Sequence, residues 1–288
     1  MTEILGKLRI AFRCHVPHLN PMQNGAEQLL AVFEEAALQA GQIILTIYRR
    51  GCGVAHKSDE SPVTEADITA EACILALLKD KLPDIPIIAE EQMSQGIRSD
   101  ISGGRFILID PLDGTREFIS HNGEFTVNIA LIDNGVPIAG IVYAPALGTA
   151  YLGGPQGAWK LTVDASGAVT ERHPIHARAV AKPPVAMISR SHLDEKCQPY
   201  LKALGVTEYR QIGSSLKFGL LAEGLADLYL RYNRTMEWDT AAGDAVLRAA
   251  GGSVLTADGA PLTYGKINRS DDADFANPGF FAWGRRDC

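Results

Sequence analysis

The stretch Asp110-Pro111-Leu112-Asp113-Gly114-Thr115 decides how this chain folds around its chemistry. It follows an apolar run at 106–109, which predicts a buried strand. Pro111 and Gly114 then turn the chain sharply, so two aspartates three positions apart leave the same end of that strand. Carboxylates held in this way suit small, hard cations such as Mg2+, and the apolar Leu112 between them could add only its backbone carbonyl.

The residues after this turn favour anion binding. The segment from Thr115 to Phe118 predicts a helix start, whose free N–H groups suit a phosphate. Metal ligands beside a phosphate-binding turn indicate phosphoryl chemistry. The alternative is that Asp-Pro and Asp-Gly pairs are ordinary turn formers.

Two further acidic sites favour the metal interpretation. A second apolar strand at 85–89 ends in Glu90-Glu91, and far downstream Trp238-Asp239-Thr-Ala-Ala-Gly-Asp244 opens a helix, with Asp239 near its first turn. One carboxylate at a helix N-terminus is usually only a cap. Three acidic sites at the ends of strands or helices are better explained by shared cations.

In order and spacing, these three motifs resemble the signature of the inositol monophosphatase-like family of magnesium-dependent, lithium-sensitive phosphatases. The resemblance covers the chain from about Gly25 to its end. Within the family the chain is most similar to the bacterial bisphosphate nucleotidases, through the stretches 57–67, 122–133, 188–192, 212–218 and 277–280.

The resemblance implies two or three Mg2+ ions, whose ligands would be Glu90, Asp110, the Leu112 carbonyl, Asp113 and Asp239. Glu90 and Thr115, supported by Asp67, would orient the attacking water. Asp113 and the amides of Gly114 and Thr115 would bind the transferred phosphate. From the sequence alone, Asp67 in the first turn of a helix capped by Thr64 would only stabilise the helix dipole. The resemblance instead places Asp67 in the active site, hydrogen-bonded to Thr115.

Substrate choice depends on a second group of residues. Ser214, Ser215 and Lys217 follow a predicted strand and begin a helix, a natural place for a second anion. Arg231 ends another strand on the approach to Asp239, which would also contact substrate, and an arginine suits an additional phosphate. The alternative is that Lys217 and Arg231 are solvated surface charges.

The resemblance thus implies hydrolysis of adenosine 3′,5′-bisphosphate, a small phosphorylated nucleotide, to AMP and phosphate. It also implies activity on 3′-phosphoadenylyl sulfate and a link to sulfur assimilation. One alternative is an inositol or sugar phosphatase with the same metals. Another is a catalytically silent nucleotide-binding protein, although such a protein would be expected to have lost an acidic ligand.

The predicted elements divide the chain into two halves. Residues 25–164 predict two helices on a largely antiparallel sheet, with a hairpin at Asp133-Asn134-Gly135. A boundary is expected across 165–184, and residues 165–288 then alternate strands and helices, as in a mixed α/β sheet. The fold class is therefore α+β followed by α/β, and the resemblance joins the halves into a layered α/β/α/β/α sandwich. Residues 1–24 lie outside the family pattern, as a flexible extension or a start codon placed too early.

Composition indicates which binding partners and which cellular compartment are expected for this protein. A net charge of −7 and a pI of about 5.5 argue against a nucleic-acid surface. Five scattered cysteines suit a reducing cytoplasm and neither disulfides nor zinc. No stretch was expected to be long enough to span a membrane. We expect a cytoplasmic protein that is a monomer or a homodimer. Peripheral attachment to the cytoplasmic face of the inner membrane is an alternative.

Overall fold

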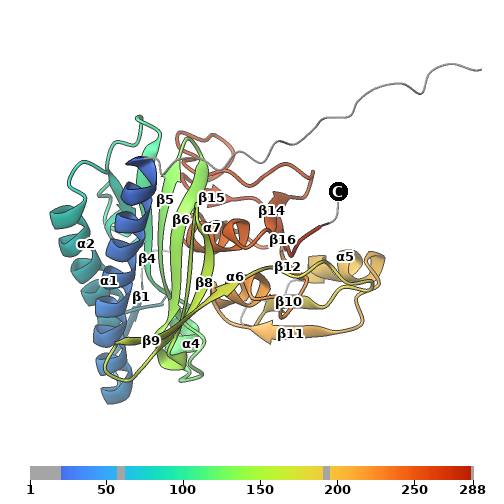
Figure 1. Cartoon of the computed structure of the whole chain (residues 1–288), viewed down its shortest axis with the longest axis horizontal. Helices are drawn as coiled ribbons and strands as arrows, with labels where there is room; N and C mark the ends of the chain where they lie inside the picture. The colour runs from blue at the N-terminus through green and yellow to red at the C-terminus, as the bar shows by residue number, and fades with distance from the viewer. Residues whose placement is uncertain (1–20, 57–61, 191–194, 287–288) are drawn as a thin grey trace, which may run out of the picture.

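The computed structural model describes residues 21–56, 62–190 and 195–286, and it consists of five alternating layers of helices and sheets. Figure 1 shows these layers from left to right, from the helices α1 and α2 through two sheets to α5. This arrangement confirms the predicted α/β/α/β/α sandwich. Most of the expected N-terminal extension and parts of the stretches 57–67 and 188–192 lie outside the described residues.

The larger sheet has seven strands in the order β3-β4-β5-β6-β7-β8-β9, and only the β3–β4 pair is parallel. The turn between β5 and β6 contains Asn134 and Gly135, with φ of 49° and 79°, which confirms the predicted hairpin. The strands are β3 (Ile87–Ala89), β4 (Arg105–Asp113), β5 (Thr126–Asp133), β6 (Val136–Ala144), β7 (Thr149–Gly154), β8 (Gly157–Val163) and β9 (Val169–Ile175). A short 3-10 helix, η1 (Pro145–Leu147), joins β6 to β7.

Two long helices, α1 (Pro21–Arg50) and α2 (Glu65–Lys81), cover one face of this sheet. Alternate residues of β5, such as Val127 and Ile129, face them in a common core. By length and composition the part of α1 from Gly25 to Arg50 could cross a membrane, which the sequence analysis did not expect. In the fold α1 is a core helix, because half of its most apolar window is buried against α2 and the sheet.

The opposite face of the larger sheet packs against the middle helical layer, α6 (Leu216–Ala222) and α7 (Ala241–Ala249). Here Ala130 and Ile132 of β5 contribute to the core, at positions that alternate with those facing α1. Helix α7 lies close to the sheet at Gly140 and Gly153, where an added Cβ would come within 2.9 Å and 2.5 Å of helix backbone atoms. The two glycines therefore set how near α7 approaches.

The smaller sheet has the order β11-β10-β12-β16-β14, and α5 (Gln198–Ala203), preceded by the 3-10 helix η2 (Glu195–Cys197), covers its outer face. Its strands are β10 (Ala186–Ser189), β11 (Tyr209–Ile212), β12 (Leu228–Arg231), β14 (Ser253–Thr256) and β16 (Phe280–Trp283). The remaining short elements are β1 (Val54–His56), β2 (Pro62–Thr64), α3 (Glu90–Ser94), α4 (Thr115–Ile119), β13 (Thr235–Met236) and β15 (Ala276–Asn277).

Several strands were missed in the sequence. β9 falls within the expected boundary segment, so the first sheet extends to Ile175. Most of β9 is exposed and polar, because it is an edge strand with one neighbour, and it therefore lacks the apolar run of an inner strand. β14 and β16 are short and follow no turn motif that the sequence analysis used.

Replacing Gly153 by alanine should destabilise the protein by about 1–3 kcal/mol, because the new methyl group would lie 2.5 Å from the Cα of Val246 and force α7 outward. Urea unfolding measures this loss. Gly103→Ala is the matched control, since nothing lies within 4 Å of a Cβ added there. Equal stability of both variants would show that the approach of α7 is not sterically limited.

Candidate active site

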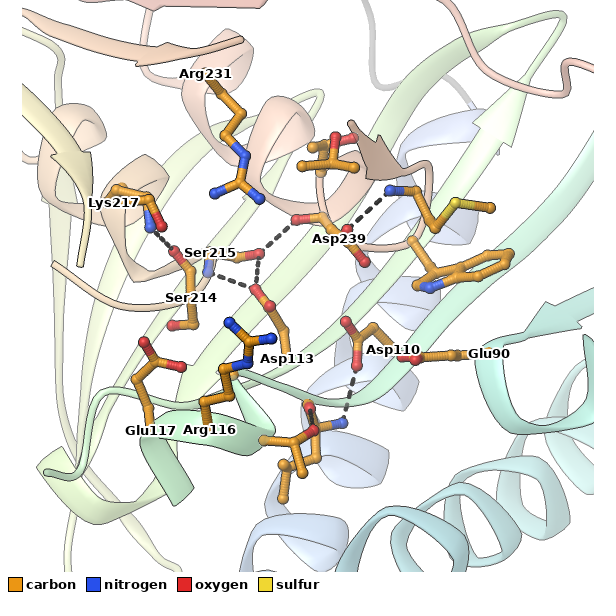
Figure 2. Close-up of a pocket in the computed structure, with 18 of the residues that line it drawn as sticks. Glu90, Asp110, Asp113, Arg116, Glu117, Ser214, Ser215, Lys217, Arg231 and Asp239 are labelled. Carbon is orange, nitrogen blue, oxygen red and sulfur yellow. Dashed lines mark hydrogen bonds between the residues drawn. The ribbon is translucent and has the colours of Figure 1, made fainter. Parts of the chain in front are cut away.

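A cavity of about 490 Å³ lies where the carboxyl ends of β3 and β4 face the loops before α6 and α7. Five carboxylates line it: those of Glu90, Asp110, Asp113 and Asp239, and that of Glu117 on α4. Figure 2 shows the first four directed toward one common space, although they come from three separate segments. The structure thus brings together the acidic residues that the three motifs predicted.

The first pair of carboxylates is set by an irregularity at the end of β4. The strand pairs regularly with β5 as far as Asp110, and its register then shifts before Asp113. Asp110, only 1% exposed, accepts a hydrogen bond from the Leu112 N–H at 3.0 Å. Gly114 adopts a φ of 91°, which a residue with a Cβ rarely adopts, and the short helix α4 follows. The predicted turn is confirmed only at Gly114: Pro111 and Leu112 remain within β4, because Asp113 still pairs with Thr126 after the shift.

Glu90 is positioned by a residue that the sequence analysis missed. It is the first residue of α3, and the buried Glu71 of α2 accepts hydrogen bonds from the next two amides, Glu91 N at 2.7 Å and Gln92 N at 2.9 Å. Glu71 therefore fixes where α3 begins. A glutamate inside a helix carries no sequence signal for such a role.

Asp67 serves both purposes that the sequence left open. One of its oxygens accepts hydrogen bonds from the amide and the hydroxyl of Thr64, both at 2.7 Å, which completes the cap of α2. Its other oxygen lies 3.2 Å from the Thr115 hydroxyl, as the family resemblance implied. The same hydroxyl lies 3.4 Å from the Leu112 carbonyl. Asp67 is 2% exposed, so it acts on the cavity through Thr115.

Asp239 lies two residues before α7 and not in its first turn, because Thr240 occupies the N-cap position. Its Oδ2 accepts a hydrogen bond from Met236 N at 2.8 Å. The amide group of Asn277 donates to the Met236 carbonyl and to the Thr240 hydroxyl, both at 2.9 Å, and so holds this loop. Asn277 belongs to the stretch 277–280, to which the sequence analysis gave no role.

Burial and charge repulsion raise the pKa of two carboxyl groups at the centre of the site. Burial raises the pKa of Asp113, and burial together with the charges of Asp113 and Glu90 raises the pKa of Asp239 well above its usual range. Carboxylates in this state are stabilised in ionised form by a nearby cation. Ionising these carboxylates together is therefore unfavourable in the absence of a cation, and the site is suited to binding one.

The last aspartate of the downstream motif has a separate role. Asp244 is fully buried, and Arg248 and the Tyr264 hydroxyl hydrogen-bond to it at 2.6 Å and 3.0 Å. Burial raises the pKa of this carboxyl to about 6. Asp244 does not line the cavity, so it ties α7 to the chain after β14.

Lys217 and Arg231 both line the cavity, in different ways. Lys217 is 2% exposed, so the alternative of a solvated surface charge is wrong for it. Its ammonium group donates to the carbonyls of Ile212 at 3.0 Å and Ser214 at 2.5 Å, and burial lowers its pKa to about 8. Arg231 is half-buried, and its guanidinium group points into the cavity (Figure 2).

Comparison with known proteins shows the family to which this chain belongs. The model of the inositol monophosphatase family matches residues 26–272. The chain belongs to the inositol monophosphatase family. It is 46% identical, over 85% of its length and 96% of the relative, to the 3′(2′),5′-bisphosphate nucleotidase CysQ of Escherichia coli (strain K12). It is 41% identical to the CysQ of Buchnera aphidicola, over 86% of this chain and 91% of that relative.

Solved structures agree with this assignment. The crystal structure of CysQ from Bacteroides thetaiotaomicron superimposes with a TM-score of 0.73 at 35% identity, covering 90% of this chain and 98% of that chain. An inositol monophosphatase from Anabaena gives a TM-score of 0.67 at 25% identity, covering 90% of this chain and 91% of that chain. The fold is thus shared between relatives named for nucleotides and for inositol phosphates.

Members of the inositol monophosphatase family are Mg2+-dependent phosphatases, and the cavity fits that ion. Glu90, Asp110, Asp113 and Asp239 form one wall of the cavity, the acidic wall. It offers only oxygen donors, which Mg2+ prefers. Throughout residues 21–56, 62–190 and 195–286, however, no three His, Cys, Asp or Glu side chains are already grouped as a metal-binding set. Asp113 and Asp239 each use one oxygen in a hydrogen bond, so a bound cation would draw the remaining donors inward.

Two further features at the site were not foreseen in the sequence. Arg116 and Arg234 line the cavity and add positive charge. Outside the lining, Glu124 forms a two-bond ion pair with Arg190, at 2.8 Å for each bond, and accepts the Gly213 N–H at 2.7 Å. This contact explains the similarity at 122–133 and 188–192: the two stretches together anchor the loop that carries Ser214 and Ser215.

Asp110→Asn should lower turnover by about a hundredfold or more, because it removes a charge whose stabilisation of bound Mg2+ is worth several kcal/mol. Asparagine keeps the shape and can still accept the Leu112 amide, so the unfolding transition should be unchanged. Phosphate release at saturating Mg2+ and calorimetric Mg2+ titration measure the two effects. The exposed Asp80→Asn on α2 is the control; full activity of Asp110→Asn would refute the metal assignment.

Proposed function

We propose that this chain is a 3′(2′),5′-bisphosphate nucleotidase that hydrolyses adenosine 3′,5′-bisphosphate to AMP and phosphate, within sulfur assimilation. The observation that carries the proposal is one cavity with two walls of opposite charge. Carboxylates for Mg2+ form one wall. Lys217 and Arg231 lie on the other, where the Glu117 carboxylate also lines the cavity near Lys217. The CysQ relatives named for this activity align over nearly their whole length.

The reaction would use the acidic wall for the phosphate that is transferred. When bound, two or three Mg2+ ions would be held by Glu90, Asp110, the Leu112 carbonyl, Asp113 and Asp239, lowering the pKa of water and neutralising charge on the leaving oxygen. Glu90 and the Thr115 hydroxyl orient the attacking water. The Asp67 carboxylate fixes the Thr115 rotamer through its 3.2 Å contact. The amides of Gly114 and Thr115 hold the phosphate oxygens.

The opposite wall would hold the rest of the substrate. Arg231 approaches the cavity from the end of β12, and Ser214, two residues before α6, lines the same cavity (Figure 2). Lys217 supplies positive charge while its hydrogen bonds hold the loop. A second phosphate needs such cations, because the carboxylates around the metals repel it. The sulfate analogue, 3′-phosphoadenylyl sulfate, carries the same reacting phosphate and an anion at the same end.

A catalytically silent role is disfavoured by the same cavity. A binding protein without activity would have no need to keep four carboxylates together against their mutual repulsion. All four acidic positions of the signature are present and line one space. The described cysteines Cys52, Cys73 and Cys197 are free thiols, which supports our placement of the reaction in the cytoplasm.

The decisive experiment compares phosphate release from adenosine 3′,5′-bisphosphate and from inositol 1-phosphate. We expect the bisphosphate to have the larger kcat/KM by at least about tenfold, because it alone offers a second anion to the cationic wall. A chelator should abolish both activities, and Mg2+ should restore them. Preference for inositol 1-phosphate would show that the metals are used for a sugar phosphate instead.

Arg231→Ala should lower kcat/KM for adenosine 3′,5′-bisphosphate by about ten- to a hundredfold, the value of a charge-assisted hydrogen bond of 1.5–3 kcal/mol. Hydrolysis of 3′-AMP, which lacks the second phosphate, should hardly change. Arg210→Ala, on the exposed strand β11 of the same sheet, is the matched control. Equal losses on both substrates would mean that Arg231 supports the fold or the metal site rather than specificity.

A further inference from the structure

Ser215 is in contact with two segments of the acidic wall. Its Oγ lies 2.5 Å from Oδ2 of Asp113 and 2.5 Å from the carbonyl oxygen of Asp239, and its amide donates to the same Asp113 oxygen at 2.6 Å. Figure 2 shows it between the two aspartates. These partners are distant in the chain, since Asp113 ends β4 and Asp239 precedes α7.

The Ser215 hydroxyl is poorly placed to bind substrate. The residue is 2% exposed, and the side-chain amide of the buried Asn128 on β5 donates to its oxygen at 3.0 Å. A hydroxyl has one hydrogen and two acceptor sites. Because Asn128 fills one acceptor site, the single hydroxyl hydrogen is left for either the Asp113 carboxylate or the Asp239 carbonyl, and the Ser215 amide holds the Asp113 carboxylate in addition.

The surrounding backbone keeps Ser215 in this position. Gly213 has no space for a side chain, since a Cβ there would lie 2.5 Å from Glu117 and 2.8 Å from the Glu124 carbonyl. Its amide is held by the Glu124 carboxylate at 2.7 Å. Ser214 then adopts a φ of 45°, which turns the chain so that Ser215 points into the layer between sheet and helix.

We propose that Ser215, oriented by Asn128, is a positioning residue that sets the spacing between the Asp113 carboxylate and the Asp239 loop, and hence the Mg2+ affinity of the site. The inference rests on the proposed Mg2+-dependent chemistry but not on the choice of substrate. Mg2+ accepts little deviation from octahedral geometry with short bonds. The group that fixes the separation of two carboxylate segments therefore acts on ion binding, although it touches neither ion nor substrate.

Ser215→Ala should weaken Mg2+ binding by about ten- to a hundredfold, as loss of a ligand-orienting partner typically does. The titration is calorimetric and uses Mg2+ alone, so it is independent of which phosphate ester is the substrate. kcat should fall at fixed Mg2+ while KM for adenosine 3′,5′-bisphosphate changes little. Ser215→Thr, which keeps the hydroxyl, should recover most of the Mg2+ affinity.

Two controls separate positioning from other roles. Ser214→Ala, one residue away on the cavity wall, should raise KM for the bisphosphate and leave Mg2+ affinity unchanged. Asn128→Ala alone should weaken Mg2+ binding. Combined with Ser215→Ala it should weaken binding little further, because Asn128 acts through the Ser215 hydroxyl. Urea unfolding confirms that each variant is folded at the titration temperature.

Unchanged Mg2+ affinity in folded Ser215→Ala would overturn the proposal, and a raised KM in that variant would assign Ser215 to the substrate. Additive effects of the Asn128 and Ser215 substitutions would overturn the orienting role of Asn128. If the Mg2+ effects hold while inositol 1-phosphate proves the better substrate, the positioning role stands and only the proposed substrate fails.

Discussion

The structure depends on holding like charges together at the place where two sheets face one another. Asp113 and Asp239 come from opposite sides of this junction. Burial raises the pKa of both, and the charge of Asp113 raises the pKa of Asp239 further. Nothing in local chain preference would bring them close. The layers must therefore fix the backbone segments that carry them, so that a cation has only to draw neighbouring side chains together.

The fixing is done by side chains behind the acidic wall that hydrogen-bond to the backbone. Glu71 sets the start of α3, Glu124 holds the loop before α6, and Asn277 holds the loop before α7. Each is buried or half-buried and binds backbone amides or carbonyls. Because backbone groups are held, the carboxylates keep their directions even though they repel, which is the preorganisation that electrostatic catalysis requires.

The sequence predicted the elements whose signals are local. The hairpin at Asn134-Gly135, the cap at Thr64 and the reversal at Gly114 follow from the conformational preferences of a few residues, and all three are confirmed. The turn expected directly after Asp110 is instead an irregularity within β4, which continues to Asp113. The acidic wall could be predicted because its motifs lie at element ends. Edge strand β9 could not, since one-sided pairing leaves it polar. Residues such as Glu71 and Asn128 could not be found either, because their partners lie 20 and 87 positions away.

The tie from Asn277 to the Asp239 loop has a consequence for biosynthesis. Asn277 follows all four carboxylates in the sequence, and strand β15 that carries it pairs with β13 beside Asp239. A ribosome releases residues in order from the N-terminus, so β3, β4 and their carboxylates emerge long before this tie can form. The acidic wall is then completed only after residue 277 has been made. Chains terminated before Asn277 would therefore lack a finished catalytic centre.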